Sequence, residues 1–187
     1  MAVNPPAPLC FPVAVNRQFV DKVTPGSRRF WQFNMSFQNE TLTLTELVDL
    51  ITAGHAWTAP HRHVRHHRPR RRNPDYTTTY RVKANVIHSQ LLALDADTED
   101  VASSFAGLLD DPFIARYAAL IHASASSRPA RPRSRVVFLL EAPLAPAAYE
   151  EALRALLFRY PFCDQSVKQA AAVFYGAQGC NYLLRDR

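Results

Sequence analysis

Six segments between residues 87 and 176 follow one another in an order that few folds accommodate. Short apolar runs rich in β-branched residues predict strands, whereas longer runs with apolar residues three or four positions apart predict helices. By these criteria the order is strand, helix, strand, strand, helix, strand, at residues 87–94, 98–109, 115–123, 134–142, 145–160 and 170–176. The sequence therefore predicts an α+β protein with a β-α-β-β-α-β core.

This order is typical of ferredoxin-like, or RRM-like (RNA-recognition-motif-like), sheets. We expect the first strand to lie between the third and the fourth, antiparallel to both, so that its end meets their beginnings. Charged side chains stand at all three places: Asp95 and Asp97 end the first strand, Arg133 and Arg135 begin the third, and Asp164 and Lys168 precede the fourth. These six residues are therefore expected to converge at one edge of the sheet.

The chain of 187 residues is long enough for one sizeable hydrophobic core but not comfortably for two. We interpret the Pro-rich residues 1–28 as an irregular N-terminal arm. Residues 29–187 are expected to form one domain, with its core at about residues 87–183.

An N-terminal α/β layer is expected to precede the core within this domain. Aromatic alternation predicts a strand at residues 29–37. A helix is predicted at residues 43–54, because Thr43 and Glu46 have the spacing of a capping box. Several prolines then predict a long loop at residues 57–76.

Positive charge is concentrated in two segments. Residues 61–72 contain six arginines and residues 128–135 contain four, and neither segment contains an acidic residue. Clustered cations bind polyanions because they displace counterions from phosphates. The first segment is therefore predicted to bind nucleic acid through Arg68, Arg70, Arg71 and Arg72. The alternative is a pair of solvated loops.

Composition limits the cellular setting that we expect. No apolar run approaches the roughly 20 residues that cross a bilayer, and the first ten residues lack a basic segment followed by an apolar one. We therefore expect a cytoplasmic protein without a membrane partner. The three cysteines are widely spaced, which predicts free thiols rather than disulfides.

Carboxylates at the twisted end of a strand are able to reach one cation together. Asp95 and Asp97 form such a pair, and Asp164 would add a third carboxylate. Mg²⁺ and Mn²⁺ take such oxygen ligands together with phosphate oxygens and water. The guanidinium of Arg135, with help from Arg133 or Lys168, is matched to a triphosphate. As an alternative, Asp97 caps the following helix.

Three motifs resemble those of the archaeo-eukaryotic primase superfamily, especially its bacterial, plasmid and phage primase-polymerases. They are LLALDAD, which ends in Asp-x-Asp, SRVVFLL after the Ser-rich turn HASASS, and CDQSVKQAAAVFYG, which begins its polar part at Asp164. The resemblance covers about residues 29–183. The chain departs from the family pattern where Ser-x-Arg replaces Ser-x-His, and where Ala170–Ala172 replace an arginine before the aromatic pair.

The resemblance implies a DNA primase or DNA polymerase that joins nucleoside triphosphates on a template with Mg²⁺ or Mn²⁺. Its catalytic metal ligands would be Asp95, Asp97 and Asp164, and its nucleotide-binding residues Arg133, Arg135, Lys168 and Ser126. The partners it implies are single-stranded or primed DNA and nucleoside triphosphates. Some relatives also work with a helicase or with CRISPR adaptation proteins.

Three other functions fit parts of the sequence. A non-catalytic RRM-like module that binds single-stranded nucleic acid needs exposed aromatic residues on its central strands, whereas LLALD and VVFLL are mostly aliphatic. A cyclase of the same topology would need no template. A zinc site at His61, His63, His66 and His67 has irregular spacing and flanking arginines, which repel a cation.

The basic segment generates a first prediction. Replacing Arg68, Arg70, Arg71 and Arg72 with glutamine should weaken DNA binding and flatten its dependence on salt concentration, since fewer counterions are released. Fluorescence anisotropy across a salt series measures both effects. Unchanged affinity would mean that the segment is only solvated.

Overall fold

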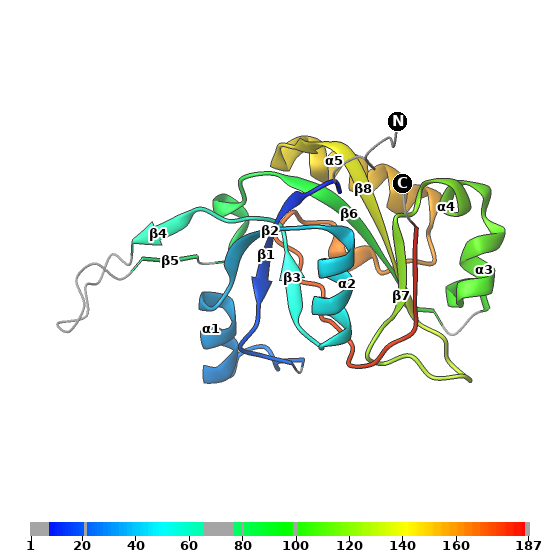
Figure 1. Cartoon of the computed structure of the whole chain (residues 1–187), viewed down its shortest axis with the longest axis horizontal. Coiled ribbons are helices and arrows are strands. Elements are labelled where there is room, and N and C mark those ends of the chain that lie inside the picture. The colour runs from blue at the N-terminus through cyan, green and yellow to red at the C-terminus, as the bar shows by residue number, and fades with distance from the viewer. Residues whose placement is uncertain (1–7, 21, 66–76, 80, 99–100, 186–187) are drawn as a thin grey trace, which may run out of the picture.

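The computed structural model describes residues 8–185, except residues 21, 66–76, 80 and 99–100. Its N-terminal layer contains β1 (Phe11–Asn16), α1 (Arg28–Met35), β2 (Gln38–Leu42), α2 (Leu44–Thr52) and β3 (Ala56–Thr58). The three strands form an antiparallel sheet in the order β2-β1-β3. A hairpin of β4 (His63–Arg65) and β5 (Thr77–Thr79) follows and projects away from the layers (Figure 1).

The second part of the chain forms an antiparallel sheet in the order β6-β8-β7-β9. Its strands are β6 (Ser89–Ala96), β7 (Leu120–Ala123), β8 (Ser134–Leu144) and β9 (Tyr182–Leu184), and its helices are α3 (Phe105–Asp110), α4 (Pro112–Tyr117) and α5 (Pro146–Arg159). Short 3-10 helices lie at Lys83–Asn85, Val101–Ser103 and Gln165–Val167. The fold is α+β, as predicted.

Alternation along β6 divides its side chains between two apolar cores. Leu92 and Leu94 face α3, α4 and α5, where they pack with residues such as Leu153. Leu91 and Ala93 point to the opposite face and pack against β1 and α2 of the N-terminal layer. Both faces of the four-stranded sheet are therefore covered (Figure 1).

The predicted antiparallel pairing of the first and third core strands is confirmed by β6 and β8, but β6 lies at the edge of the sheet and not between the third strand and a fourth. Residues 170–176 form no strand; within them Phe174 makes a single bridge to Trp57 of β3. The apolar run belongs instead to the contact between the layers, where the Phe174 and Trp57 rings lie 4.7 Å apart. The fourth strand of the sheet is β9, which pairs with β7 on the side of the sheet opposite β6.

Five other expectations differ from the structure. Residues 11–16, expected within an irregular arm, form the central strand of the N-terminal sheet. Residues 28–35 are helical because Ser27 caps them, accepting from the Phe30 N–H. The expected loop at residues 57–76 contains parts of β3 and β4.

The two remaining differences concern the segment between β6 and β7. The helix expected at residues 98–109 is broken at Ser104, which caps α3. The strand expected at residues 115–123 begins only at Leu120, because Asp111 caps α4 and accepts from two backbone N–H groups.

Gly176 fixes the distance between the two layers. A Cβ at this position would lie 2.5 Å from the His55 carbonyl oxygen and 2.6 Å from that of Ile51. The Gly176 N–H donates to the His55 carbonyl oxygen at 3.0 Å. Only glycine allows this approach, next to which Phe174 packs on Trp57 and Tyr175 packs on Phe33 of the N-terminal layer.

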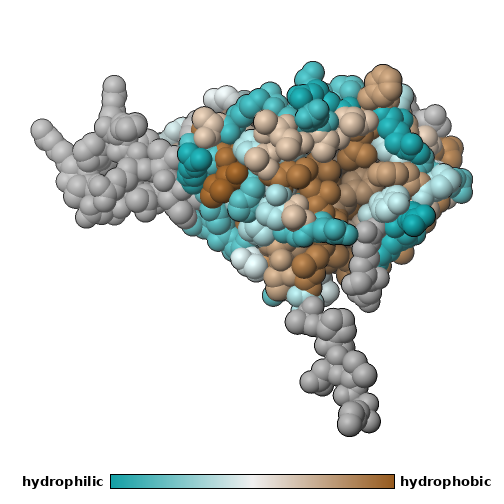
Figure 2. All heavy atoms as spheres, turned by 90° about the horizontal axis from the view of Figure 1, so that it is seen from above, coloured by the Kyte–Doolittle hydropathy of each residue, from teal (hydrophilic) through white to brown (hydrophobic). Residues whose placement is uncertain are grey.

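The upper side of the molecule carries an apolar area. Figure 2 shows apolar residues in the middle of this face, bordered by hydrophilic ones. Helix α5 lies on this side in Figure 1, and its Phe158 is 91% exposed.

The predicted helix at residues 43–54 is confirmed as α2, together with its capping box. The Thr43 Oγ1 accepts from the Glu46 N–H at 3.3 Å, and the Glu46 carboxylate accepts from the Thr43 N–H at 2.8 Å. α2 also supplies Leu47, Leu50 and Ile51 to the core that covers the sheet.

Loss of this cap should weaken the whole N-terminal layer. Thr43→Ala should lower the free energy of unfolding by about 1 kcal/mol, measured by urea denaturation. Thr45→Ala is the matched control, because Thr45 is exposed within the helix and alanine favours helices. Equal destabilisation by both substitutions would contradict a capping role for Thr43.

Candidate functional site

Two aspartate–arginine pairs lie side by side where β6 ends and β8 begins. Asp95 is the register partner of Arg135, and its Oδ2 accepts from Arg135 Nη2 at 2.8 Å. Two positions further along the same face, Arg133 Nε lies 2.5 Å from Asp97 Oδ1. The predicted convergence of these four residues is confirmed, and each acid of the Asp-x-Asp motif has its own arginine.

The Asp95–Arg135 pair is almost enclosed. The Arg135 side chain is 6% exposed and that of Asp95 is 22% exposed. Arg135 Nη1 also donates to the Tyr175 carbonyl oxygen at 2.8 Å, and its guanidinium carbon lies 4.9 Å from the centre of the Phe174 ring. Arg135 thus joins the four-stranded sheet to the segment that Gly176 holds against the end of α2.

The Asp97–Arg133 pair is more open. The Arg133 side chain is 19% exposed and that of Asp97 is 39% exposed. Arg133 Nη1 also donates to Ser126 Oγ at 3.2 Å, from the Ser-rich turn between β7 and β8. The residues assigned to nucleotide binding thus include one buried arginine and one accessible arginine.

Asp164 lies beside this site through its backbone. Its N–H donates to the Asp95 carbonyl oxygen at 2.8 Å, next to a single bridge between Ala96 and Cys163. The Asp164 carboxylate accepts from the Ser166 N–H at 2.8 Å and from Ser166 Oγ at 2.9 Å, and so caps a 3-10 helix. Burial, reinforced by the charges of Asp95 and Asp164, raises the pKa of the Cys163 thiol to about 12.

His122 extends the row of Asp95 and Arg135 across the sheet. It is the register partner of Arg135 on β7 and is fully buried, with its Nδ1 3.0 Å from the Ala123 carbonyl oxygen. Burial, and then the positive charge of Arg135, lowers the pKa of His122 to about 3. A neutral imidazole therefore separates Arg135 from the outer strand β9.

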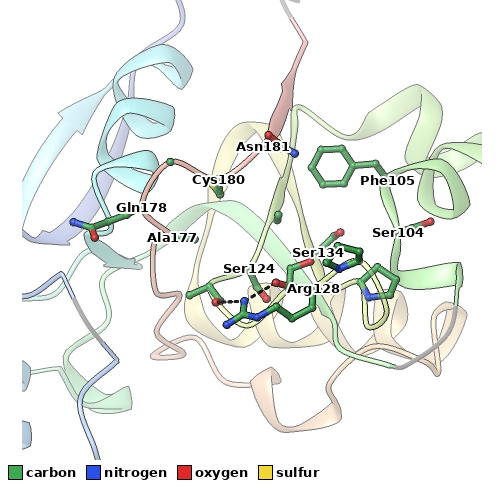
Figure 3. A pocket seen from close by; sticks show the side chains of 15 residues that line it. Ser104, Phe105, Ser124, Arg128, Ser134, Ala177, Gln178, Cys180 and Asn181 are labelled. Atoms are coloured by element: carbon green, nitrogen blue, oxygen red, sulfur yellow. Dashed lines mark hydrogen bonds between the residues drawn. The ribbon is translucent and has the colours of Figure 1, made fainter.

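An open cleft of about 640 Å³ adjoins the same end of the sheet. Ser134, between the two arginines in sequence, lines it together with Ser124 and Arg128 of the turn and with Phe105 and Asn181 (Figure 3). Arg128 is held in place by the Ala125 and Ser127 carbonyl oxygens, at 3.3 Å and 2.6 Å. The cleft offers hydroxyl groups, two side-chain amides, a cation and one aromatic ring to a ligand.

Sequence reasoning missed this cleft, because its walls come from three distant segments. The Ser-rich turn was visible in the sequence, but Phe105 was expected within a longer helix. Asn181 follows a segment whose path depends on the contact between the layers. The exclusive pairing of each aspartate with one arginine was not predicted either.

Other predicted site residues have no contact with this cluster in the described hydrogen bonds and ion pairs, or fall outside the described residues. Lys168 is exposed beyond the 3-10 helix. Arg68, Arg70, Arg71 and Arg72 fall in residues 66–76, outside the described part of the chain. His61 is fully buried, and burial lowers its pKa to about 4.

Within the described ranges, no three His, Cys, Asp or Glu side chains are grouped so as to hold a metal ion. The carboxylates of Asp95 and Asp97 still suit Mg²⁺, which proteins bind through one or two carboxylates plus substrate phosphates rather than through a complete protein cage. The donor set therefore fits a metal ion shared with a phosphate ligand.

No family model and no curated protein matches the sequence. Among solved structures, the AEP domain of the primase-polymerase of cyanophage S-2L is similar, with a TM-score of 0.46 and 11% identity over 93% of this chain and 80% of that chain. Function therefore rests on the side chains themselves. In the part of the chain that the structure describes, no helix has the length and apolarity to cross a membrane.

The two ion pairs should differ in their contribution to stability. Asp95→Asn leaves the buried Arg135 without its counter-charge, and should lower the free energy of unfolding by about 3 kcal/mol. Asp97→Asn disrupts a more exposed pair and should cost less than about 1 kcal/mol. Urea denaturation at neutral pH measures both. Equal losses would contradict the difference in burial.

Proposed function

We propose that this chain is a metal-dependent nucleotidyltransferase that joins nucleoside triphosphates on a DNA template. The observation that carries the proposal is the row of paired acids and arginines at one edge of the sheet, next to an open cleft. Polymerising enzymes need these elements together: carboxylates for divalent cations, cations for phosphates and a space for the nucleoside.

Asp95 and Asp97 would hold the metal ion with their carboxylate oxygens. When bound, a divalent cation would lower the pKa of the attacking hydroxyl group and neutralise charge on the leaving pyrophosphate. Asp164 as a third ligand stays a prediction, since its carboxylate accepts two hydrogen bonds from Ser166.

Arg133 is the arginine that we assign to the triphosphate. Its side chain is partly exposed and lies beside Ser126, whereas Arg135 is fixed by Asp95 and the Tyr175 carbonyl oxygen. A forked guanidinium is able to donate two hydrogen bonds to phosphate oxygens at once. Arg135 then has a different task, which is to orient the Asp95 carboxylate.

The cleft is the place that we assign to the sugar and base. Phe105 offers a ring face, and Ser124, Ser127 and Asn181 offer hydrogen-bonding groups at its walls. Since Ser134, the neighbour of Arg133, lines the cleft, the triphosphate of a nucleotide whose sugar and base occupy the cleft would be within reach of Arg133. Lys168 stays a prediction for the triphosphate.

The alternative of a non-catalytic RRM-like module is less well supported. Such modules stack bases on aromatic residues of an open sheet face. Here one face of the four-stranded sheet packs against α3, α4 and α5, and the other packs against the N-terminal layer. Association with a helicase or with CRISPR adaptation proteins stays a prediction of the sequence resemblance alone.

Nucleotide incorporation tests the proposal. The protein is incubated with Mg²⁺ or Mn²⁺, single-stranded or primed DNA, and either ribonucleotides or deoxyribonucleotides, and the products are separated by gel electrophoresis. We expect template-dependent extension, reduced at least about a hundredfold in Asp97→Asn. Asp97 is the better probe because loss of its charge leaves the buried ion pair intact.

Asp49→Asn is the control, since Asp49 is an exposed acid on α2, away from the acid pair. It should extend primers at the rate of the unaltered protein. Full activity of Asp97→Asn would overturn the assignment of the site. No incorporation under any condition would overturn the function, and a cyclic nucleotide as product would favour the cyclase.

A further inference from the structure

The two arginines of the site differ in how many contacts hold them. Arg135 is fixed by Asp95, by the Tyr175 carbonyl oxygen and by the face of the Phe174 ring. Arg133 is held at its guanidinium by Asp97 and, at 3.2 Å, by Ser126 in an exposed turn. The Arg133 side chain is therefore able to change partners without disturbing the core.

The backbone of Arg133 is anchored even though its side chain is accessible. Its N–H donates to Ser127 Oγ at 3.0 Å, and its carbonyl oxygen accepts from the Ser124 N–H at 3.0 Å. Movement of the guanidinium thus needs only side-chain rotation from a fixed point. From that point it lies between Asp97 and the Ser-rich wall of the cleft.

Pairing with arginine reduces what the acid pair offers to a cation. Two aspartates and two arginines have no net charge together, so a divalent ion approaching Asp97 must first overcome the positive charge of Arg133. A triphosphate attracts the same guanidinium with a larger negative charge and forked acceptor oxygens. Phosphate and carboxylate therefore compete for Arg133.

We propose that Arg133 is a positioning residue that exchanges Asp97 for the triphosphate, and that this exchange makes Asp97 more available to the metal ion when a nucleotide is present. The inference rests on the proposed function, because it assigns the metal ion to the acid pair. It adds that binding of the metal ion and binding of the triphosphate are coupled through the Arg133 side chain. A pair of ligands linked in this way raises each other's affinity by the same factor.

The first test measures Mn²⁺ alone, without any nucleotide. Mn²⁺ is titrated into the protein, and free Mn²⁺ is followed by electron paramagnetic resonance. Arg133→Gln should bind Mn²⁺ at least about fivefold more tightly than the unaltered protein, because Asp97 has lost its competing partner. Arg133→Lys keeps the positive charge and should stay close to the unaltered protein.

Two further variants separate this effect from a general change in charge. Arg131→Gln removes the same charge from an exposed position of the same turn, and should leave Mn²⁺ affinity unchanged. In an Asp97→Asn background, Arg133→Gln should bring no gain, since the carboxylate that it releases is gone. Circular dichroism checks that each variant is folded.

The second test measures the affinity of the protein for a phosphate chain in the absence of metal ions. Inorganic tripolyphosphate is titrated calorimetrically in the presence of a chelator, and Arg133→Gln should bind it at least about fivefold more weakly. Arg131→Gln should bind it like the unaltered protein. Equal tripolyphosphate affinity in all three proteins would overturn the exchange.

The outcomes distinguish this inference from the proposed function. Absence of Mn²⁺ binding in every variant, both without and with a nucleoside triphosphate, would overturn the metal site, and with it both proposals. Equal Mn²⁺ affinity in the unaltered protein and in Arg133→Gln would overturn only the coupling. A gain of the same size in Arg131→Gln would also overturn it, because the effect would then be general electrostatics.

Discussion

The buried pair of Asp95 and Arg135 holds together the parts from which the candidate site is built. Arg135 reaches from β8 to Asp95 on the neighbouring strand, and from there to the Tyr175 carbonyl oxygen and the Phe174 ring across the layers. Removing a charge from water is costly unless it is paired, and this guanidinium is paired through both of its terminal nitrogens. Its position sets the direction of the Asp95 carboxylate, and the more accessible pair is built next to it.

Local patterns predicted the elements whose side chains divide cleanly between core and solvent. Strand β6 and helices α2 and α5 were predicted from their apolar spacing, and α2 also from its capping box. The convergence of Asp95 and Asp97 with two arginines followed from strand order alone, because antiparallel pairing of β6 and β8 fixes which residues face each other.

Patterns failed where a distant contact decides the outcome. Residues 170–176 have the composition of a strand, but Phe174 packs on Trp57 and the chain continues to β9 at the other edge. The alternating aromatic residues at 29–37 predicted a strand, but residues 28–35 form a helix that Ser27 caps. The burial of Arg135 could not be predicted from local sequence either, because its contact with the Tyr175 carbonyl oxygen joins residues that are 40 positions apart.

Gly176 takes no part in the proposed chemistry, but its close approach to the end of α2 affects the candidate site. Any larger residue would push the Tyr175–Gly176 segment away from α2, and would shift the Tyr175 carbonyl oxygen that accepts from Arg135. The acid pair and this glycine are therefore expected to be inherited as one unit. In variants of this chain that lack the acid pair, we therefore expect substitutions at Gly176 to be tolerated more readily than in variants that keep it.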